Sequence, residues 1–258
     1  MLLENKNAVI YGGGGSIGGA VARAFAREGA KVHLAGRTLA SLEEVAEEIR
    51  SAGGVAETAQ VDALDETAVD EHADAMAASA GSIDISFNLI SYGDTQGTAL
   101  AEMSVEDFER PVVAAVRTQF LTSRAAARHM IRQGSGVILT FGGAGGRDPI
   151  RDYYSGGHQI FLGGFQVALG AIDVLRRQLA CELGPHGIRV VTLQSGGVPE
   201  TISEEWREII TEGLVASTML KRPETLEDVG NVAAFAASDL ARSMTATAFN
   251  ITYGRVVD

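Results

Sequence analysis

Short apolar runs alternate along the chain with longer stretches in which apolar residues recur at every third or fourth position. The short runs are rich in β-branched residues and predict strands, whereas the longer stretches are rich in Ala, Glu and Arg and predict helices. The expected strands are "NAVIY", "AKVHLA", "VAETAQV", "IDISFNLI", "GVILTF", "IRVVTLQ" and "TAFNIT". Strands that alternate with helices pair in parallel through right-handed crossovers, and nearly all-apolar strands indicate a sheet covered on both faces. The pattern therefore predicts a Rossmann-type doubly wound α/β fold with a seven-stranded parallel sheet flanked by helices.

Residues typical of helix ends agree with this division of the chain. Glycines follow several helical runs, as C-terminal caps do, and two pairs of polar residues resemble N-terminal capping pairs. The glycines are Gly29, Gly53, Gly81 and Gly134, and the pairs are Ser104 with Asp107 and Thr225 with Asp228. No linker or internal repeat interrupts the alternation, so we expect residues 1–258 to form a single domain.

Composition narrows the class of protein. The net charge of −12 would repel a polyanion, so we expect no nucleic-acid partner. No apolar run approaches the roughly 18 residues that cross a bilayer, so we expect no membrane partner. The N-terminus lacks a basic leader followed by an apolar stretch, and the single cysteine, Cys181, fits a reducing compartment. These features together predict a cytoplasmic protein.

An acidic stretch, "DETAVDEHADAM", places Asp70 and Asp74 one helical turn apart with His72 between them. Such residue types ligate metal ions, but a solvated acidic helix face explains the pattern better. We therefore expect no metal site.

The four consecutive glycines at 12–15 lie between the first predicted strand and the first predicted helix. In a doubly wound fold, backbone N–H groups and the positive helix end meet a pyrophosphate at this place, and glycines allow close approach. A glycine turn without a ligand is the alternative. Arg37 follows the second strand with no acidic residue at the strand end, which favours the 2′-phosphate of NADP over NAD. A solvated arginine is the alternative reading of Arg37.

The motifs then show a family resemblance over essentially the whole chain. "YGGGGSIG" is similar to the TGxxxGxG motif of the short-chain dehydrogenase/reductase family, "NLIS" to its NNAG, and "ELGPHGIRV" is typical of it. Ser16 also resembles the enoyl-reductase branch of the family. The resemblance implies an oxidoreductase that binds NADP and acts on a small-molecule substrate. The residues that it implies for cofactor contact are Gly12, Ser16, Ile17, Gly18, Arg37, Asp62, Ala63, Asn88 and Thr201.

At the positions that match the catalytic residues of the family, this chain has residues whose side chains cannot donate a proton. The family uses a serine, a tyrosine and a lysine four residues later, because a carbonyl that accepts hydride needs a proton and a nearby ammonium lowers the pKa of the phenol. Counting back from "ELGPHG" places the tyrosine on Phe165 and the lysine on Leu169, and the serine falls on Gly143. A further asparagine position falls on Ala115. The resemblance therefore predicts a member with an atypical, degenerate active site.

Other residues can supply the missing chemistry. The stretch "DYYSGGHQIF" places Tyr154 four residues before His158, on one face if the helix begins early. Its glycines favour a loop over 144–162 instead, from which Tyr153, Tyr154 or His158 can still act. Tyr92 and Asp94 follow the fourth strand, near the expected pocket mouth. The catalytic candidates are Tyr154, His158 and Tyr92.

These observations favour reduction of imines or activated alkenes over reduction of simple ketones. The alternatives are a non-redox enzyme on the same scaffold, such as a lyase or isomerase, and a non-catalytic NADP-binding protein. We expect a substrate lid at about 199–222, which contains Trp206, the only tryptophan. Helices at 104–133 and near 163–184 are rich in Ala and Val on more than one face, so we expect a homo-oligomer, a tetramer or a dimer.

Overall fold

The computed structural model describes residues 1–143, 154–155, 158–159 and 161–257. The strands are β1 (Asn7–Tyr11), β2 (Lys31–Gly36), β3 (Val55–Gln60), β4 (Ile85–Asn88), β5 (Gly136–Gly143), β6 (Tyr154–Ser155), β7 (His158–Gln159), β8 (Ile188–Ser195) and β9 (Ala248–Asn250). The helices are α1 (Ser16–Arg27), α2 (Leu39–Ser51), α3 (Glu66–Ala80), α4 (Val105–Gln133), α6 (Gly163–Leu183), α7 (Glu204–Ser217) and α8 (Leu226–Ala237). Short 3₁₀ helices are η1 (Gly184–His186), η2 (Pro199–Thr201) and η3 (Asp239–Ala241).

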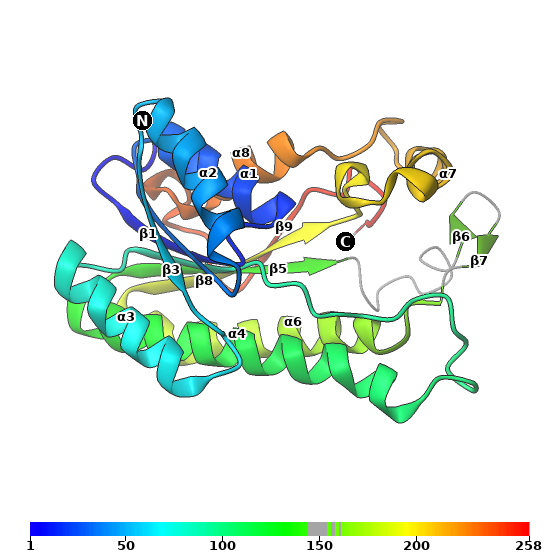
Figure 1. Ribbon diagram of the computed structural model, residues 1–258, viewed down its shortest axis with the longest axis horizontal. Helices are drawn as coiled ribbons and strands as arrows, with labels where there is room; N and C mark the ends of the chain where they lie inside the picture. Colours follow the sequence, from blue (N-terminus) through cyan, green and yellow to red (C-terminus); the bar gives the residue numbers. More distant parts are fainter. Residues whose placement is uncertain (144–153, 156–157, 160, 258) are drawn as a thin grey trace.

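The main sheet has seven strands in the order β3-β2-β1-β4-β5-β8-β9, and every neighbouring pair is parallel. The chain winds outward from β1 to β3 and then returns to the centre at β4, so the order reverses between β1 and β4. In open parallel sheets, ligands bind outside the carboxyl ends of the strands at such a switch point. The predicted doubly wound α/β fold is confirmed, and it brings the glycine turn and the ends of β4, β5 and β8 to one edge (Figure 1).

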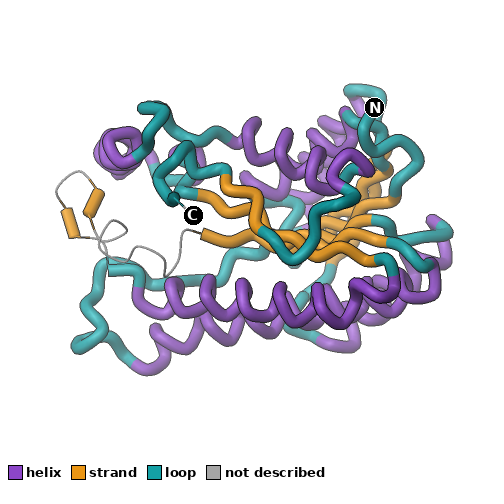
Figure 2. Tube along the Cα trace, turned by 180° about the vertical axis from the view of Figure 1, so that it is seen from behind, coloured by secondary structure: helices purple, strands orange, loops and turns teal. Residues whose placement is uncertain are grey.

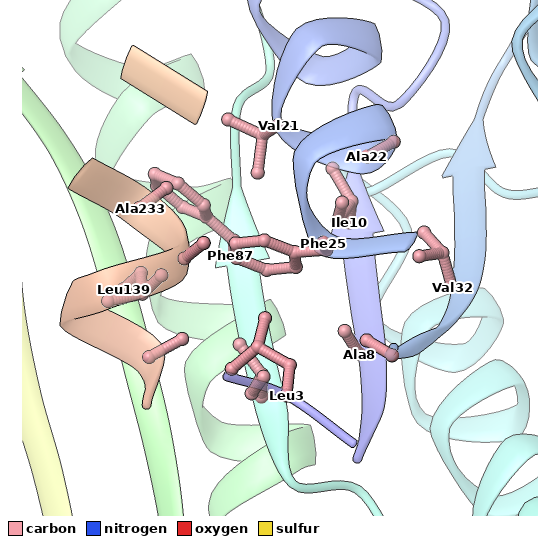
Figure 3. Packing of buried hydrophobic residues seen from close by; sticks show 14 of the residues in the cluster. Leu3, Ala8, Ile10, Val21, Ala22, Phe25, Val32, Phe87, Leu139 and Ala233 are labelled. Atoms are coloured by element: carbon pink, nitrogen blue, oxygen red, sulfur yellow. The ribbon is translucent and has the colours of Figure 1, made fainter. Parts of the chain in front are cut away.

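Helices cover both faces of the sheet. Helices α1, α2 and α8 lie on one face, and α3, α4 and α6 lie on the other (Figures 1 and 2). On the first face, Phe25 of α1 and Phe87 of β4 are fully buried beside Ala233 of α8 (Figure 3). A Cβ on Gly230 of α8 would lie 2.9 Å from the Cβ of Ala24, so small residues let α1 and α8 approach closely.

The predicted helix ends are confirmed where the structure resolves a cap. Gly81 and Gly134 end α3 and α4 with positive φ angles of 86° and 71°, which glycine adopts without strain. The Ser104 side chain accepts a hydrogen bond at the start of α4. Thr225 and Asp228 form a reciprocal capping box at the start of α8.

The segment between β5 and α6 does not form the early helix that would place Tyr154 and His158 on one face. The backbone places Tyr154 in β6 and His158 in β7, and these strands pair antiparallel with Ser155 opposite His158. The two candidates therefore do not share a helix face, because the chain turns back between them. Their side chains, and residues 144–153 with Tyr153, lie outside the described residues.

A search of the described part of the chain finds no helix long and apolar enough to cross a membrane.

Candidate active site

Most glycines of the turn between β1 and α1 are required by the protein's own packing. Gly12 has a φ of +81°, and a Cβ there would lie 2.6 Å from the carbonyl oxygen of Leu89. A Cβ on Gly18 would collide with the carbonyl of Gly12, so α1 and the turn pack backbone against backbone. Gly15 differs, because its Cβ would meet only the Gly12 carbonyl oxygen at 3.4 Å, an ordinary contact. Of these three glycines, only Gly15 faces space that the chain leaves open.

The N-terminus of α1 presents donors at this open space. The first bond into the helix runs from Gly19 N–H to Gly15 O at 2.7 Å, so the N–H groups of Ser16, Ile17 and Gly18 precede it. No side chain caps the helix. Unpaired first-turn N–H groups and the positive end of the helix dipole form a site for an anion such as a phosphate. The geometry therefore fits the pyrophosphate of a dinucleotide.

Two charged residues follow the strands beside this turn. Arg37 is exposed directly after β2, and its guanidinium forms no ion pair or hydrogen bond with any described residue. Its backbone carbonyl accepts a hydrogen bond from the Gln60 side chain at 2.9 Å, which holds the turn. Asp62 follows β3, is exposed, and accepts a hydrogen bond from Leu64 N–H at 3.0 Å. Arg37 is thus a cation at the sheet edge that is available to bind an anion.

The remaining predicted cofactor residues lie at the same edge but are partly occupied by the fold. Asn88 is 2% exposed, and its amide bonds the Thr122 hydroxyl and the Ile90 N–H, which ties β4 to α4. Ala63 is buried beyond β3. The Thr201 hydroxyl donates to the Val198 carbonyl at 2.8 Å, and its oxygen can still accept a hydrogen bond.

The positions counted as catalytic come together with Tyr92 in one apolar cluster. Tyr92, Ala115 and Leu169 are buried in it, and Phe165 packs against it. The rings of Tyr92 and Phe165 have centroids 6.2 Å apart. Burial raises the pKa of Tyr92, so its phenol stays protonated at neutral pH. Asp94 hydrogen-bonds the Gln96 side chain at 2.6 Å, outside the cluster. Tyr92 is therefore the candidate whose described side chain can donate a hydrogen bond.

A cavity of about 230 Å³ adjoins this cluster between α6 and the sheet. Gly143 and Leu169 line it, together with four polar residues that sequence reasoning missed: Asp173, Arg177, Thr192 and Gln194. Asp173 accepts a hydrogen bond from Arg177 at 2.6 Å, and the amide oxygen of Gln194 is buried with no hydrogen-bond partner in the described structure. Leu169, Asp173 and Arg177 recur at intervals of four, and this spacing is the signal that could have placed them on one face.

Known proteins resemble this chain in architecture and in sequence. A family model described as enoyl-(acyl carrier protein) reductase matches residues 13–255. An uncharacterised oxidoreductase of Bacillus subtilis is 32% identical over 245 residues, which cover 92% of this chain and 86% of the relative. The chain belongs to the short-chain dehydrogenase/reductase family. A 3α-hydroxysteroid dehydrogenase of Mediterraneibacter gnavus is 31% identical over 255 residues, which cover 95% of this chain and 94% of the relative.

A solved structure extends the comparison to the whole fold. A 3-ketoacyl-(acyl-carrier-protein) reductase from Brucella melitensis, in complex with NADH, is 28% identical with a TM-score of 0.84. The match covers 99% of this chain and all of that chain (100%). The protein is thus a short-chain dehydrogenase/reductase-type oxidoreductase, of a family that binds NAD(H) or NADP(H). The non-redox and non-catalytic alternatives are not favoured by these comparisons.

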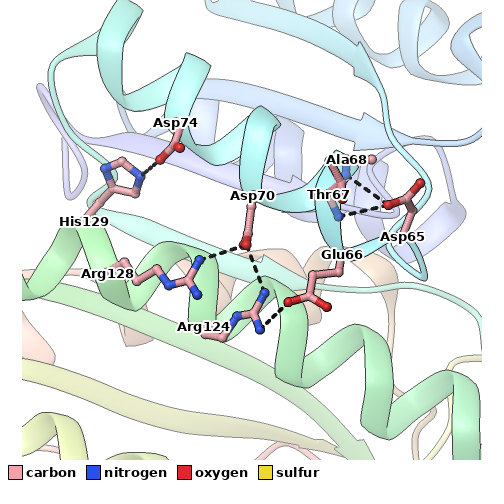
Figure 4. A network of polar contacts seen from close by, with 9 residues as sticks. All are labelled: Asp65, Glu66, Thr67, Ala68, Asp70, Asp74, Arg124, Arg128 and His129. Atoms are coloured by element: carbon pink, nitrogen blue, oxygen red, sulfur yellow. Dashed lines mark hydrogen bonds and ion pairs between the residues drawn. The ribbon is translucent and has the colours of Figure 1, made fainter.

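The acidic stretch of this short-chain dehydrogenase/reductase chain is not a freely solvated face. Asp70 of α3 binds both Arg124 and Arg128 of α4, at 3.0 and 2.8 Å, and Asp74 binds His129 at 2.8 Å (Figure 4). The face is still exposed to solvent, as expected, since the Asp74 side chain is 75% exposed, but the expectation did not include its basic partners, which lie on a helix more than 50 residues away in sequence. Among the described residues, no group of three or more His, Cys, Asp or Glu side chains is placed to hold a metal ion.

His72, between these two acids, turns toward the sheet instead. Its Nδ1 lies 3.3 Å from the hydroxyl of Tyr11, the last residue of β1. Burial and, to a lesser extent, His33 lower the pKa of His72 to about 4, so the ring is neutral at physiological pH. The pair joins α3 to the strand that leads into the glycine turn.

Proposed function

We propose that this protein is an NADP(H)-dependent reductase with a non-standard active site, which reduces imines or activated alkenes in preference to simple ketones. The observation that carries the proposal is the apolar cluster in which Phe165 and Leu169 pack with Tyr92. Where other members of the family place a proton-donating phenol and an ammonium, this chain places a phenyl ring and an isobutyl group.

The cofactor part of the proposal rests on the fit of the glycine turn and on Arg37. The N–H groups of Ser16, Ile17 and Gly18 would bind the pyrophosphate, and Gly12 shapes the turn beneath them. Arg37, exposed after β2, would pair with a 2′-phosphate, because charge-assisted hydrogen bonds are stronger than neutral ones. The Brucella melitensis relative holds NADH, so the preference for NADP rests on this arginine alone. When bound, the reduced cofactor supplies a hydride.

The other proposed cofactor contacts come from the ends of three further elements. Asp62 and Ala63 after β3 would contact the adenine end, Asn88 at the end of β4 would support the ribose side, and Thr201 in η2 would bind the nicotinamide carboxamide. The hydroxyl oxygen of Thr201 keeps an acceptor site for that amide.

The substrate preference follows from the protons that each reaction needs. A ketone becomes an alkoxide when it accepts hydride, and Phe165, Leu169 and Gly143 have no proton to donate to it. An iminium ion becomes neutral when it accepts hydride, so it needs none. In an activated alkene, hydride adds to the β-carbon and the electron pair moves to the distant carbonyl oxygen, where a hydrogen bond from the protonated Tyr92 hydroxyl can stabilise the enolate until water protonates the α-carbon. Tyr154 and His158 remain proposed catalytic residues beside it.

The proposal includes the assembly of the enzyme. We treat residues 1–258 as one catalytic domain in which 199–222, with η2 and α7, closes over the substrate. Exposed apolar residues on α4 and α6 support pairing of these helices in a dimer or tetramer. They are Val113, Phe120, Val167 and Val174.

A matched panel of substrates tests the function. NADPH oxidation would be measured with cyclohexanone, cyclohexenone and a five-membered cyclic imine, using the wild type, Tyr92→Phe and Tyr154→Phe. We expect turnover of the enone or the imine, negligible turnover of cyclohexanone, and a loss of enone activity in Tyr92→Phe or Tyr154→Phe. Since cyclohexanone and cyclohexenone differ only in the double bond, brisk reduction of cyclohexanone by the wild type would refute the proposal.

A further inference from the structure

A buried carboxyl group outside the described site holds the end of strand β8. Glu224 lies in the turn between α7 and α8 and is 3% exposed. Its Oε2 atom accepts hydrogen bonds from the Ser195 hydroxyl and the Gly196 N–H, both at 3.0 Å. The Ser195 oxygen in turn accepts a hydrogen bond from Gly197 N–H at 3.1 Å. One carboxylate oxygen therefore fixes the start of the turn at 195–198, directly and through the serine.

The second oxygen of the Glu224 carboxyl group, Oε1, lacks such hydrogen bonds. The Oε1 atom is buried, and no described residue hydrogen-bonds it. It borders a cavity of about 10 Å³, smaller than a side chain, which Glu224, Arg255 and Thr252 line. Arg255 donates to the Gly196 carbonyl at 2.6 Å, so the same glycine is bound on both its N–H and its C=O.

The two protonation states of Glu224 bind this turn differently. The ionised group offers acceptors only, and both groups that face Oε2 are donors, so the ionised form matches them. Protonation on Oε1 creates a buried donor with no acceptor among the described residues, and protonation on Oε2 competes with Ser195 and Gly196 for the same oxygen. The neutral form therefore holds the turn less firmly.

The surroundings set the pH at which this change occurs. Burial raises the pKa of Glu224 to about 7, although the hydrogen bonds from Gly196 and Ser195 act in the opposite direction. Asp228 of α8 raises it further. The charged and titratable groups on the C-terminal segment are Tyr253 and Arg255, and Arg222 stacks over the Tyr253 ring at 4.8 Å. Among the described residues, β8 faces the group with the Ser195 hydroxyl and α7 faces it with Leu214, and both side chains are uncharged.

The turn leads directly to the proposed nicotinamide end of the site. Val198 accepts two hydrogen bonds from Thr201, and Glu200 binds Leu226 N–H at 3.0 Å. We infer that Glu224 is a positioning residue whose ionised form fixes the turn at 195–198 and thereby strengthens binding of the nicotinamide half of the cofactor. This inference rests on the proposed function, because Thr201 is placed at the carboxamide by that proposal.

Comparing a whole dinucleotide with its adenine half isolates the nicotinamide end. Dissociation constants would be measured by calorimetry for NADPH and 2′,5′-ADP, and for NADH and 5′-ADP, on both sides of neutral pH. The 2′-phosphate titrates in both members of the first pair, so its effect cancels in their ratio. We expect the dinucleotide to gain about tenfold over its adenine half as Glu224 ionises.

Two variants assign the effect to Glu224. Glu224→Gln keeps an acceptor oxygen but never ionises, so its ratio should not change with pH. Glu227→Gln, which removes an exposed charge three residues away, should keep the wild-type profile. If Glu224→Gln does not fold, Ser195→Ala replaces it, and losing that hydrogen bond should move the midpoint of the profile to higher pH.

The outcomes separate the inference from the proposed function. A folded chain that binds no dinucleotide at any pH overturns both. A dinucleotide that binds with a pH-independent ratio overturns the inference alone, as does a slope that persists in Glu224→Gln. An unshifted midpoint in Ser195→Ala also contradicts it.

Discussion

The two halves of the sheet edge differ in polarity. Around β1 and β2, the first N–H groups of α1 and Arg37, whose guanidinium has no partner among the described residues, form the proposed anion site. Around β5 and α6, Phe165, Leu169 and Tyr92 form an apolar cluster. In the proposed function, separate elements bind the nucleotide and supply the proton chemistry. The fold is therefore informative about nucleotide binding, whereas the proton chemistry depends on individual side chains.

The largest expected effect comes from giving the apolar half the groups that it lacks. The double variant Phe165→Tyr with Leu169→Lys should raise cyclohexanone reduction by about 100-fold, because general acid catalysis contributes about 10²–10⁴-fold. Steady-state NADPH oxidation measures this, with Leu169→Lys alone as the control for a new charge in the cluster. An unchanged rate in a folded double variant would show that other residues control ketone chemistry.

The buried charge beside β8 should have the next largest effect, on stability. The folded pKa of Glu224, about 7, lies above its ordinary value of 4.5, so its favourable contribution is present below pH 4.5 and is lost as pH rises through 7. The shift corresponds to about 3 kcal/mol. The unfolding free energy of the wild type should therefore fall relative to that of Glu224→Gln as the pH rises from 5 to 8, when both are measured by urea denaturation. A constant difference between the two proteins across that range would contradict the raised pKa.

The glycine turn allows a comparison between two chemically identical substitutions. Gly18→Ala forces a Cβ into the Gly12 carbonyl, so it should lower the unfolding free energy by about 2 kcal/mol. Gly15→Ala meets only open space and should leave stability nearly unchanged while it weakens NADPH binding, since its Cβ projects where a pyrophosphate would approach. Thermal unfolding and calorimetry measure the two effects. Equal destabilisation by both variants would refute the distinction between packing and ligand glycines.

The smallest expected effect concerns the choice of nucleotide. Arg37→Ala should weaken NADPH binding by about tenfold, or about 1.4 kcal/mol, and leave NADH binding unchanged. Arg23→Ala is a suitable control, because Arg23 is a surface arginine of α1 that is paired with Glu48. Parallel titrations of both nucleotides give the answer, and equal losses for NADPH and NADH would remove Arg37 from the 2′-phosphate site.

The sequence was sufficient for the fold because the relevant signals are local. Alternating apolar runs and helical stretches determine parallel crossovers, and glycines such as Gly81 and Gly134 mark helix ends through their own backbone angles. The features that sequence reasoning missed are non-local. Asp70 meets Arg124 and Arg128 from another helix, and the prediction of a solvated acidic face did not include these ion pairs.

The candidate site shows the same division. The glycine turn was predictable because its spacing is a local motif, but the sequence gives no distance between Gly18 and the Gly12 carbonyl, so packing and ligand glycines looked alike. Glu224 had no signal in sequence, since its partners lie at 195–196 on another element. Helical spacing left open a shared helix face for Tyr154 and His158, although the glycines favoured a loop, and the backbone places the two residues in a pair of short antiparallel strands.

The attachment of α3 has a consequence for how the native protein opens. This helix buries Val69, Ala73 and Met76 in a core cluster that it shares with α4, and ion pairs at its surface also join it to α4 (Figure 4). Salt screens such pairs more than it weakens apolar packing. The amide hydrogens of α3 should therefore exchange with solvent before those of α4, and earlier still at high ionic strength, as a unit of local unfolding at the edge of the molecule.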